Sequence, residues 1–103
     1  MDTLHQLRSG NLRGATRLDL SCGLTEVPSE VFDLADSLEI LNLTGNALSS
    51  LPDDLPRLRK LRILFCSSNA FTSFPEIIGS CPRLRMVGFK SNQIEHVPEN
   101  SLP

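Results

Sequence analysis

The feature that most constrains this fold is a pattern of apolar residues that restarts every 23 residues. The copy beginning at Leu38 reads L-x-x-L-x-L-x-x-N-x-L-x-x-L-P-x-x-L-x-x-L. The next copy begins at Leu61 and fills each position with an apolar residue or with the same Asn or Pro. A unit of this length cannot bury its apolar face alone, so successive copies have to stack around a shared core.

The repeats divide nearly the whole chain. A third copy starts at Leu84 and is incomplete at Pro103, and an earlier copy has one residue fewer before Leu24 and one more before Leu38. The predicted units are 15–37, 38–60, 61–83 and 84–103 (incomplete). Residues 1–14 are predicted to form an N-terminal helical cap, since Thr3 and Gln6 match a capping box and Gly10 is a typical helix stop.

Each repeat contains one short strand and one return segment. Apolar residues alternate with other residues at Leu41 and Leu43, and at the matching positions of the other copies, as in a strand with one buried face. Leu51, Leu55 and Leu58 follow at spacings of four and three, which is typical of a helical or 3₁₀ turn. We therefore expect an α/β solenoid with parallel strands on its concave face and these turns on its convex face.

Three asparagines recur at the same place in successive copies. Asn46, Asn69 and Asn92 follow the strands, and Cys22 is assigned to the same position in the first copy. We predict a structural ladder, in which the amides point inward and bind backbone groups where the chain leaves each strand.

The pattern resembles the leucine-rich repeat in its cytoplasmic 23-residue form, where Cys is an accepted alternative to Asn. The resemblance covers residues 15–103 and implies a right-handed β-α superhelix that binds a partner protein. Residues 16–28, 63–69 and 86–90 also resemble the N-terminal repeats of bacterial leucine-rich-repeat serine/threonine protein kinases, but no kinase motif is present in the chain. A secreted bacterial effector is a weaker alternative, because such effectors tend to have shorter repeats.

The strand residues that alternate with the core leucines form columns across the predicted concave face. Ile40, Ile63 and Met86 share one column with Arg17, and Asn42, Phe65 and Gly88 share the next with Asp19. We predict an exposed apolar patch with Phe65 as its anchor beside a groove at Gly88. The candidate protein-binding residues are Ile40, Asn42, Ile63, Phe65, Met86 and Lys90. The alternatives are that other parts of the protein cover these residues, or that the pattern simply tolerates apolar residues there.

Composition excludes other classes of function. The net charge of -2 and the lack of a long apolar run argue against nucleic acid or membrane partners. Cys22, Cys66 and Cys81 form no metal or redox motif, and no catalytic motif occurs, so we expect no cofactor, no metal, no enzyme activity and a cytoplasmic location. Arg57, Arg59, Lys60, Arg62, Arg83 and Arg85 form a basic cluster, for which solvated charge is favoured over a phosphate or acidic-partner site.

The last repeat ends in mid-pattern at Pro103. Because a solenoid needs a cap on its terminal repeat, we expect either that the chain is part of a longer protein or that it associates with itself through an open C-terminal end.

Overall fold

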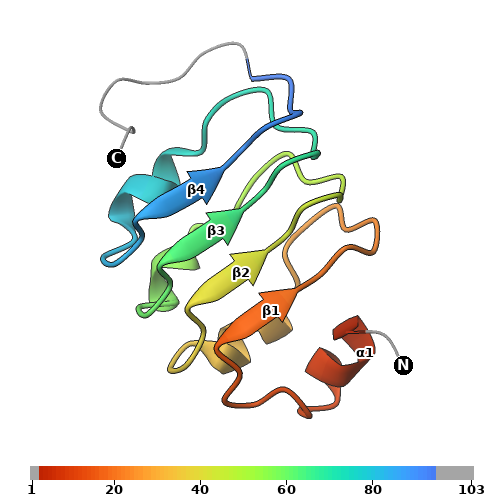
Figure 1. Cartoon of the computed structure of the whole chain (residues 1–103), viewed down its shortest axis with the longest axis vertical. Helices are drawn as coiled ribbons and strands as arrows, with labels where there is room; N and C mark the ends of the chain where they lie inside the picture. The colour runs from red at the N-terminus through yellow and green to blue at the C-terminus, as the bar shows by residue number, and fades with distance from the viewer. Residues whose placement is uncertain (1–2, 95–103) are drawn as a thin grey trace.

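The computed structural model of the chain describes residues 3–94, and they form one row of stacked repeats (Figure 1). The elements, in chain order, are the helix α1 (Thr3–Arg8), β1 (Arg17–Asp19), the 3₁₀ helix η1 (Ser29–Leu34), β2 (Ile40–Asn42), η2 (Leu55–Arg57), β3 (Ile63–Phe65), η3 (Glu76–Ser80) and β4 (Met86–Gly88). The rest of the predicted fourth repeat, including His96, Val97 and Pro98, lies outside the described residues.

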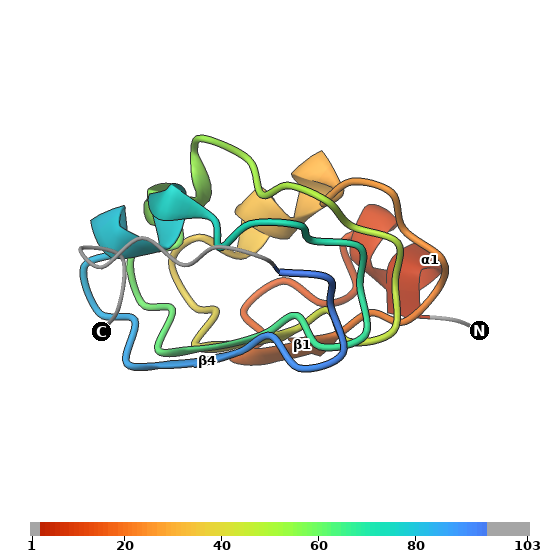
Figure 2. The ribbon, with the colours of Figure 1, turned by 90° about the horizontal axis from the view of Figure 1, so that it is seen from above.

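The four strands form a single parallel sheet in the order β1-β2-β3-β4. Seen from above, the strands lie along one side of the molecule and the 3₁₀ helices along the other (Figure 2). The register matches residues 23 positions apart, as in Leu18↔Leu41 and Leu41↔Leu64. The predicted α/β solenoid with parallel strands and 3₁₀ turns is therefore confirmed, because the repeat period and the sheet register are the same.

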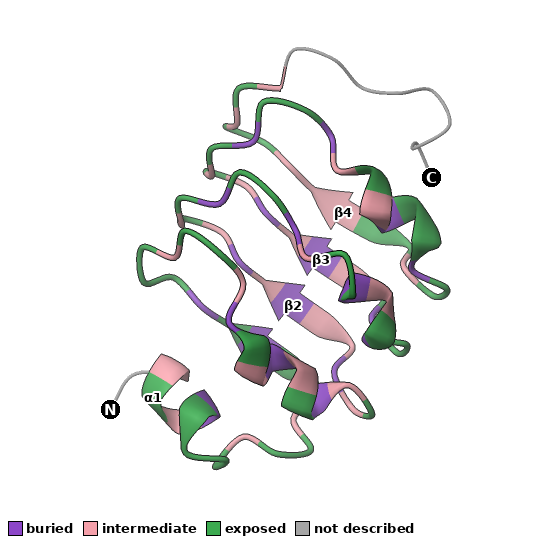
Figure 3. Cartoon of the chain, turned by 180° about the vertical axis from the view of Figure 1, so that it is seen from behind, coloured by how far each residue is buried: buried purple, intermediate pink, exposed green. Residues whose placement is uncertain are grey.

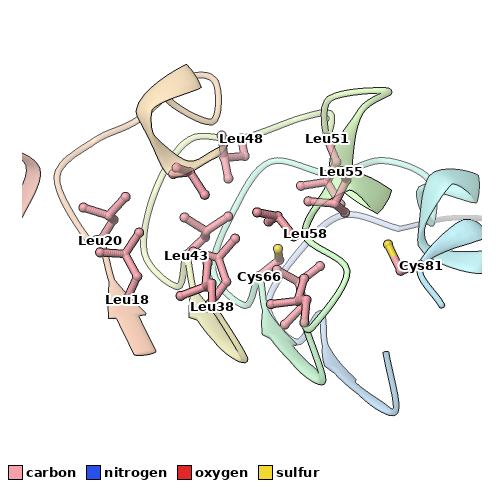
Figure 4. Close-up of a cluster of buried hydrophobic side chains, with 14 of the residues drawn as sticks. Leu18, Leu20, Leu38, Leu43, Leu48, Leu51, Leu55, Leu58, Cys66 and Cys81 are labelled. Atoms are coloured by element: carbon pink, nitrogen blue, oxygen red, sulfur yellow. The ribbon is translucent and has the colours of Figure 1, made fainter. Parts of the chain in front are cut away.

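The core lies between the sheet and the 3₁₀ helices. Figure 3 shows buried positions both in the strands and in the return segments, and Figure 4 shows leucine side chains from both sides gathered between them. Leu41, Leu43 and Leu64 from the strand side have no exposed surface, and neither do Leu55 and Leu58 from the return segment. Burying one such side chain is worth about 1.5–3 kcal/mol. The stack is therefore stabilised mainly by contacts between neighbouring repeats.

Prolines start two of the three 3₁₀ helices. Pro28 precedes η1 and Pro75 precedes η3, each with an extended backbone conformation. In η2, Pro56 stands within the first turn instead. Proline suits these places because its fixed φ is compatible with the first turn, where its missing N–H leaves no hydrogen bond unmade.

α1 covers the N-terminal end of the stack. It buries Leu7 and packs against η1, where Arg8 Nε lies 3.7 Å from Glu30 Oε2. Gly10 follows with a φ of 82°, the left-handed conformation that commonly ends a helix. No helix in residues 3–94 has the length and apolar character needed to cross a membrane.

Toward the C-terminal end of the stack, the core contains phenylalanines in place of leucines. Phe71 replaces a leucine of the preceding repeat and packs edge-to-face on Phe89, with ring centroids 5.2 Å apart, and Phe74 lies 5.1 Å from Phe89. Cys66, which is fully buried, occupies a leucine position between Leu43 and Phe89. The small thiol lies in the repeat that also has to accommodate the large ring of Phe71.

Candidate protein-binding face

The asparagine ladder is structural. Asn69 Nδ2 donates to the carbonyl oxygens of Leu43 and Cys66, at 2.9 and 3.0 Å, and its Oδ1 accepts from Leu48 N–H at 3.0 Å. Asn46 and Asn92 make the corresponding bonds one repeat earlier and one repeat later. Each amide therefore joins its own turn to the preceding repeat and is not available to a partner.

Cys22 is not a member of this ladder, contrary to the sequence prediction. Its side chain is exposed, and its backbone N–H instead donates to Asn46 Oδ1 at 3.0 Å. The physical reason is that a ladder amide reaches back to the repeat before it. The first repeat has no preceding strand, so nothing requires an amide at that position.

Two columns of side chains cover the outer face of the sheet, and they are the columns that the repeat predicts. Arg17, Ile40, Ile63 and Met86 are in register, and so are Asp19, Asn42, Phe65 and Gly88. We call these eight residues the concave face. Its candidate binding residues are thus neighbours in space, and Lys90 follows β4 two residues after Gly88.

The β1 end of the concave face is a closed polar network. Arg17 donates to both carboxylate oxygens of Asp19, at 2.9 and 3.1 Å, and Asn42 Nδ2 donates to Asp19 Oδ1 at 3.0 Å. The hydrogen bond from Arg17 holds the pKa of Asp19 below its usual value. Arg17 and Asp19 are not among the predicted binding residues, although opposite charges two residues apart on one strand face are a signal visible in the sequence.

The apolar end of the face is less exposed than predicted. Ile40, Ile63 and Phe65 are half-buried, and Met86, with 53% of its surface exposed, is the exposed large apolar residue of residues 3–94. The prediction of one broad exposed patch is therefore wrong. Strands about 4.8 Å apart bring the side chains of a column into contact, so that they cover one another.

The predicted groove beside Phe65 is also filled. A Cβ atom placed on Gly88 would lie 3.1 Å from Phe65 Cδ1 and 3.6 Å from Ser67 Oγ. The ring of Phe65 therefore lies across the backbone of Gly88, and the missing side chain of the glycine makes room for it. The result is a flat apolar surface over β3 and β4 in place of a groove.

The basic cluster is partly neutralised by acidic residues, two of them one repeat earlier and one in the same repeat. Arg62 Nε lies 3.0 Å from Glu39 Oε1, Arg59 pairs with Asp36, and Arg57 pairs with Asp54 at 3.2 Å. The guanidinium of Arg57 also lies over the ring of Phe32, 5.1 Å from its centroid. These pairs are on the surface, where each contributes about 0–1 kcal/mol.

The cysteines have different environments. Burial raises the pKa of the Cys66 thiol to about 12, and burial also raises the pKa of Cys81. Both side chains are in the apolar core, whereas Cys22 is on the surface. Within the described part of the chain, no group of His, Cys, Asp and Glu has the arrangement of a metal site.

An open cleft lies on the convex side, where the loops of the second and third repeats meet. Its lining includes Ser50, Asp53, Phe74, Glu76 and Ile77. The carboxylates of Asp53 and Glu76 give it an acidic character.

Comparisons with known proteins point to one family. The family model "Leucine rich repeat" matches residues 13–71. The leucine-rich repeat protein LIC12759 of Leptospira interrogans is similar in structure, with a TM-score of 0.75 and 30% identity over 91% of this chain and 24% of that one. The leucine-rich repeat domain of the type III effector XCV3220 (XopL) has a TM-score of 0.75 and 25% identity, over 94% of this chain and 33% of that one. No curated protein sequence matches the chain.

Proposed function

The chain belongs to the leucine-rich repeat family, and we propose that it is an interaction module that holds a partner protein on its concave face. Leucine-rich repeat domains are generally protein-interaction modules. The observation that carries the assignment to the concave face is the exposed side chain of Met86, which continues the apolar surface of Phe65 and Ile63 at the β4 end. Ile63 and Phe65 are half-buried, so the three side chains together form a contiguous, partly exposed apolar surface, and a contiguous apolar surface commonly marks a binding site.

Panning a random peptide library against the wild-type protein tests this proposal without a known partner. Selected peptides are then measured against Met86→Ala and Phe65→Ala, and against Ile77→Ala as a matched control on the convex side. Ile77 is a half-buried apolar residue of η3 that lines the convex cleft. We expect the two concave variants to lower affinity about tenfold or more, as for an interface anchor, and the control to leave it unchanged. Loss of affinity in Ile77→Ala alone would move the site to the cleft.

A second candidate is that the chain is the recognition arm of a larger bacterial serine/threonine kinase. It is supported by the resemblance of residues 16–28, 63–69 and 86–90 to that family, and the similar solved chains are three to four times longer than the part they share with this one. The coding sequence downstream of Pro103 tests it, because a kinase domain has to follow there.

The other functional expectations stay predictions. They are that the chain itself has no enzyme activity, that it acts in the cytoplasm, and that it binds neither nucleic acid nor membrane. The similarity to a type III effector domain supports the effector alternative more than the repeat period alone does.

A further inference from the structure

Charge is distributed unevenly along the stack. The five ion pairs of the described chain all lie within residues 8–62. Residues 83–94 contain Arg83, Arg85 and Lys90 and no acidic residue, and all three cations are exposed. The C-terminal part of the described sheet therefore has unbalanced positive charge, although the whole chain has a net charge of -2.

Within residues 3–94 no ion pair involves Arg85, and the repeat register gives a reason. Glu39, Arg62 and Arg85 occupy one column, joined by backbone hydrogen bonds from Arg62 N–H to Glu39 O and from Arg85 N–H to Arg62 O. Arg62 uses the carboxylate of Glu39. The neighbour of Arg85 in the column is thus another arginine, which is itself paired, so an acidic group from outside would form a new pair with Arg85.

The two cations flank the apolar surface. Along β4 and the residues beside it the order is Arg85, Met86, Gly88 and Lys90, and the ring of Phe65 lies across Gly88. We call Arg85, Met86, Phe65 and Lys90 the β4 strip. At about 3.3 Å per residue, Arg85 and Lys90 are roughly 16 Å apart along the chain, which is the length of a short extended peptide.

The other end of the concave face offers less to a charged partner. Arg17, Asp19 and Asn42 already satisfy one another there by hydrogen bonds. A partner would have to break these bonds, whereas no ion pair among the described residues involves Arg85 or Lys90. Recognition is therefore concentrated over β3 and β4.

We propose that the β4 strip binds an extended acidic segment of a partner protein, with an apolar side chain on Met86 and Phe65 and carboxylates on Arg85 and Lys90. The inference rests on the proposed function and names the chemistry of the partner. The planar guanidinium of Arg85 suits bidentate contact with a carboxylate, and such charge-assisted hydrogen bonds are stronger than neutral ones.

Fluorescence anisotropy with the fluorescein-labelled peptide Glu-Glu-Leu-Leu-Glu-Glu tests the proposal at low salt. Matched peptides replace the glutamates by lysine or the leucines by glycine. We expect Arg85→Glu and Lys90→Glu each to weaken binding of the acidic peptide about tenfold, and added salt to weaken it further. Met86→Ala should weaken binding about fivefold, largely independently of salt. Arg13→Glu is the control, because Arg13 is exposed, has no ion pair, and changes the net charge equally.

Several outcomes would overturn the proposal. Equal loss in Arg13→Glu would show a general charge effect, and equal binding of the lysine peptide would remove the charge preference. Tighter binding of a single-stranded RNA oligonucleotide at the strip would replace the acidic peptide by nucleic acid. Dimerisation in light scattering that Arg85→Glu abolishes would make a second copy the occupant. If library peptides bind the concave face but are not acidic, the proposed function stands and this inference fails.

Discussion

At the scale of the residue, the ladder asparagines show how one side chain links two repeats. The amide group of Asn69 meets three backbone carbonyls and one N–H, from both its own repeat and the one before. A backbone group left buried without a hydrogen-bond partner costs about 1–3 kcal/mol. Because the amide of Asn69 is the partner of several such groups, it contributes to the free energy of unfolding through all of them.

Asn69→Leu should therefore lower the free energy of unfolding by about 2–4 kcal/mol, because several buried groups lose their partner together. Urea denaturation followed by circular dichroism measures this. Asn11→Leu is the matched control, since Asn11 is exposed and its side chain makes no hydrogen bond, and we expect less than about 0.5 kcal/mol there. An unchanged midpoint for Asn69→Leu would contradict a structural role for the ladder.

Cys22 is a residue whose role was predicted wrongly from its sequence position. The sequence pattern accepts cysteine where the other repeats have asparagine, and so it assigns Cys22 to the ladder. The structure places its side chain on the surface, because a ladder residue needs a preceding repeat to bind. The 23-residue offset of the sheet register also places Cys22 at the position of Gly45 and not at that of Asn46.

At the scale of the element, the turn after each strand uses a left-handed backbone conformation. Gly45, Ser68 and Ser91 precede the three ladder asparagines and have φ angles of 79°, 55° and 57°. In the first repeat Gly23 has a φ of 72° directly before Leu24. The positive φ thus recurs at the same position in the last three repeats, whereas in the shorter turn of the first repeat it is shifted by one residue.

Ser68→Gly should stabilise the protein by about 0.5 kcal/mol, because relief of the left-handed strain exceeds the entropy that glycine adds to the unfolded chain. Gly45→Ala should destabilise it by about 1–2 kcal/mol, since φ is positive and the new Cβ would lie 3.0 Å from Ser21 Oγ. Thermal melts of both variants measure these changes. Ser49→Gly, at an exposed residue without a positive φ, is the control and should not gain stability.

The strands show a division between backbone and side chain. Their register places Phe65 opposite Gly88, as the repeat predicts. Whether that pair forms a groove or a filled surface depends on the side-chain rotamer of Phe65, which the sequence does not specify. The ring lies over the glycine because doing so buries apolar surface that would otherwise face water.

At the scale of the whole molecule, each repeat depends on its neighbours. β3 pairs with β2 on one side and with β4 on the other, and Leu64 at its centre has no exposed surface. A stack of this kind behaves as a row of coupled units, in which a defect in the middle weakens contacts in both directions.

Leu64→Ala should lower the free energy of unfolding by about 2–5 kcal/mol, as for other buried leucines that leave a cavity. Hydrogen exchange should speed up in β1 as well as in β4, because the repeats unfold together. Ile63→Ala, on the half-buried outer face of the same strand, is the control and should cost less. If amides in β1 kept their full protection in Leu64→Ala, the repeats would be unfolding independently.

The sequence by itself determined the repeat units, the direction of each strand side chain and the identity of the core leucines. It could do so because side chains alternate along a strand and because stacking equal repeats makes the sheet register equal to the repeat period. The columns of the concave face follow from the same two facts.

Only the tertiary structure decided how much of that face is available to a partner. The exposure of a side chain on this face, and whether its charge is paired, depend on which side chains of the neighbouring repeat lie beside it. Phe65 covers Gly88, Arg62 is paired with Glu39, and Arg85 follows Arg62 in its column. These are contacts between residues 23 positions apart, whose side-chain geometry a pattern of residue types does not contain.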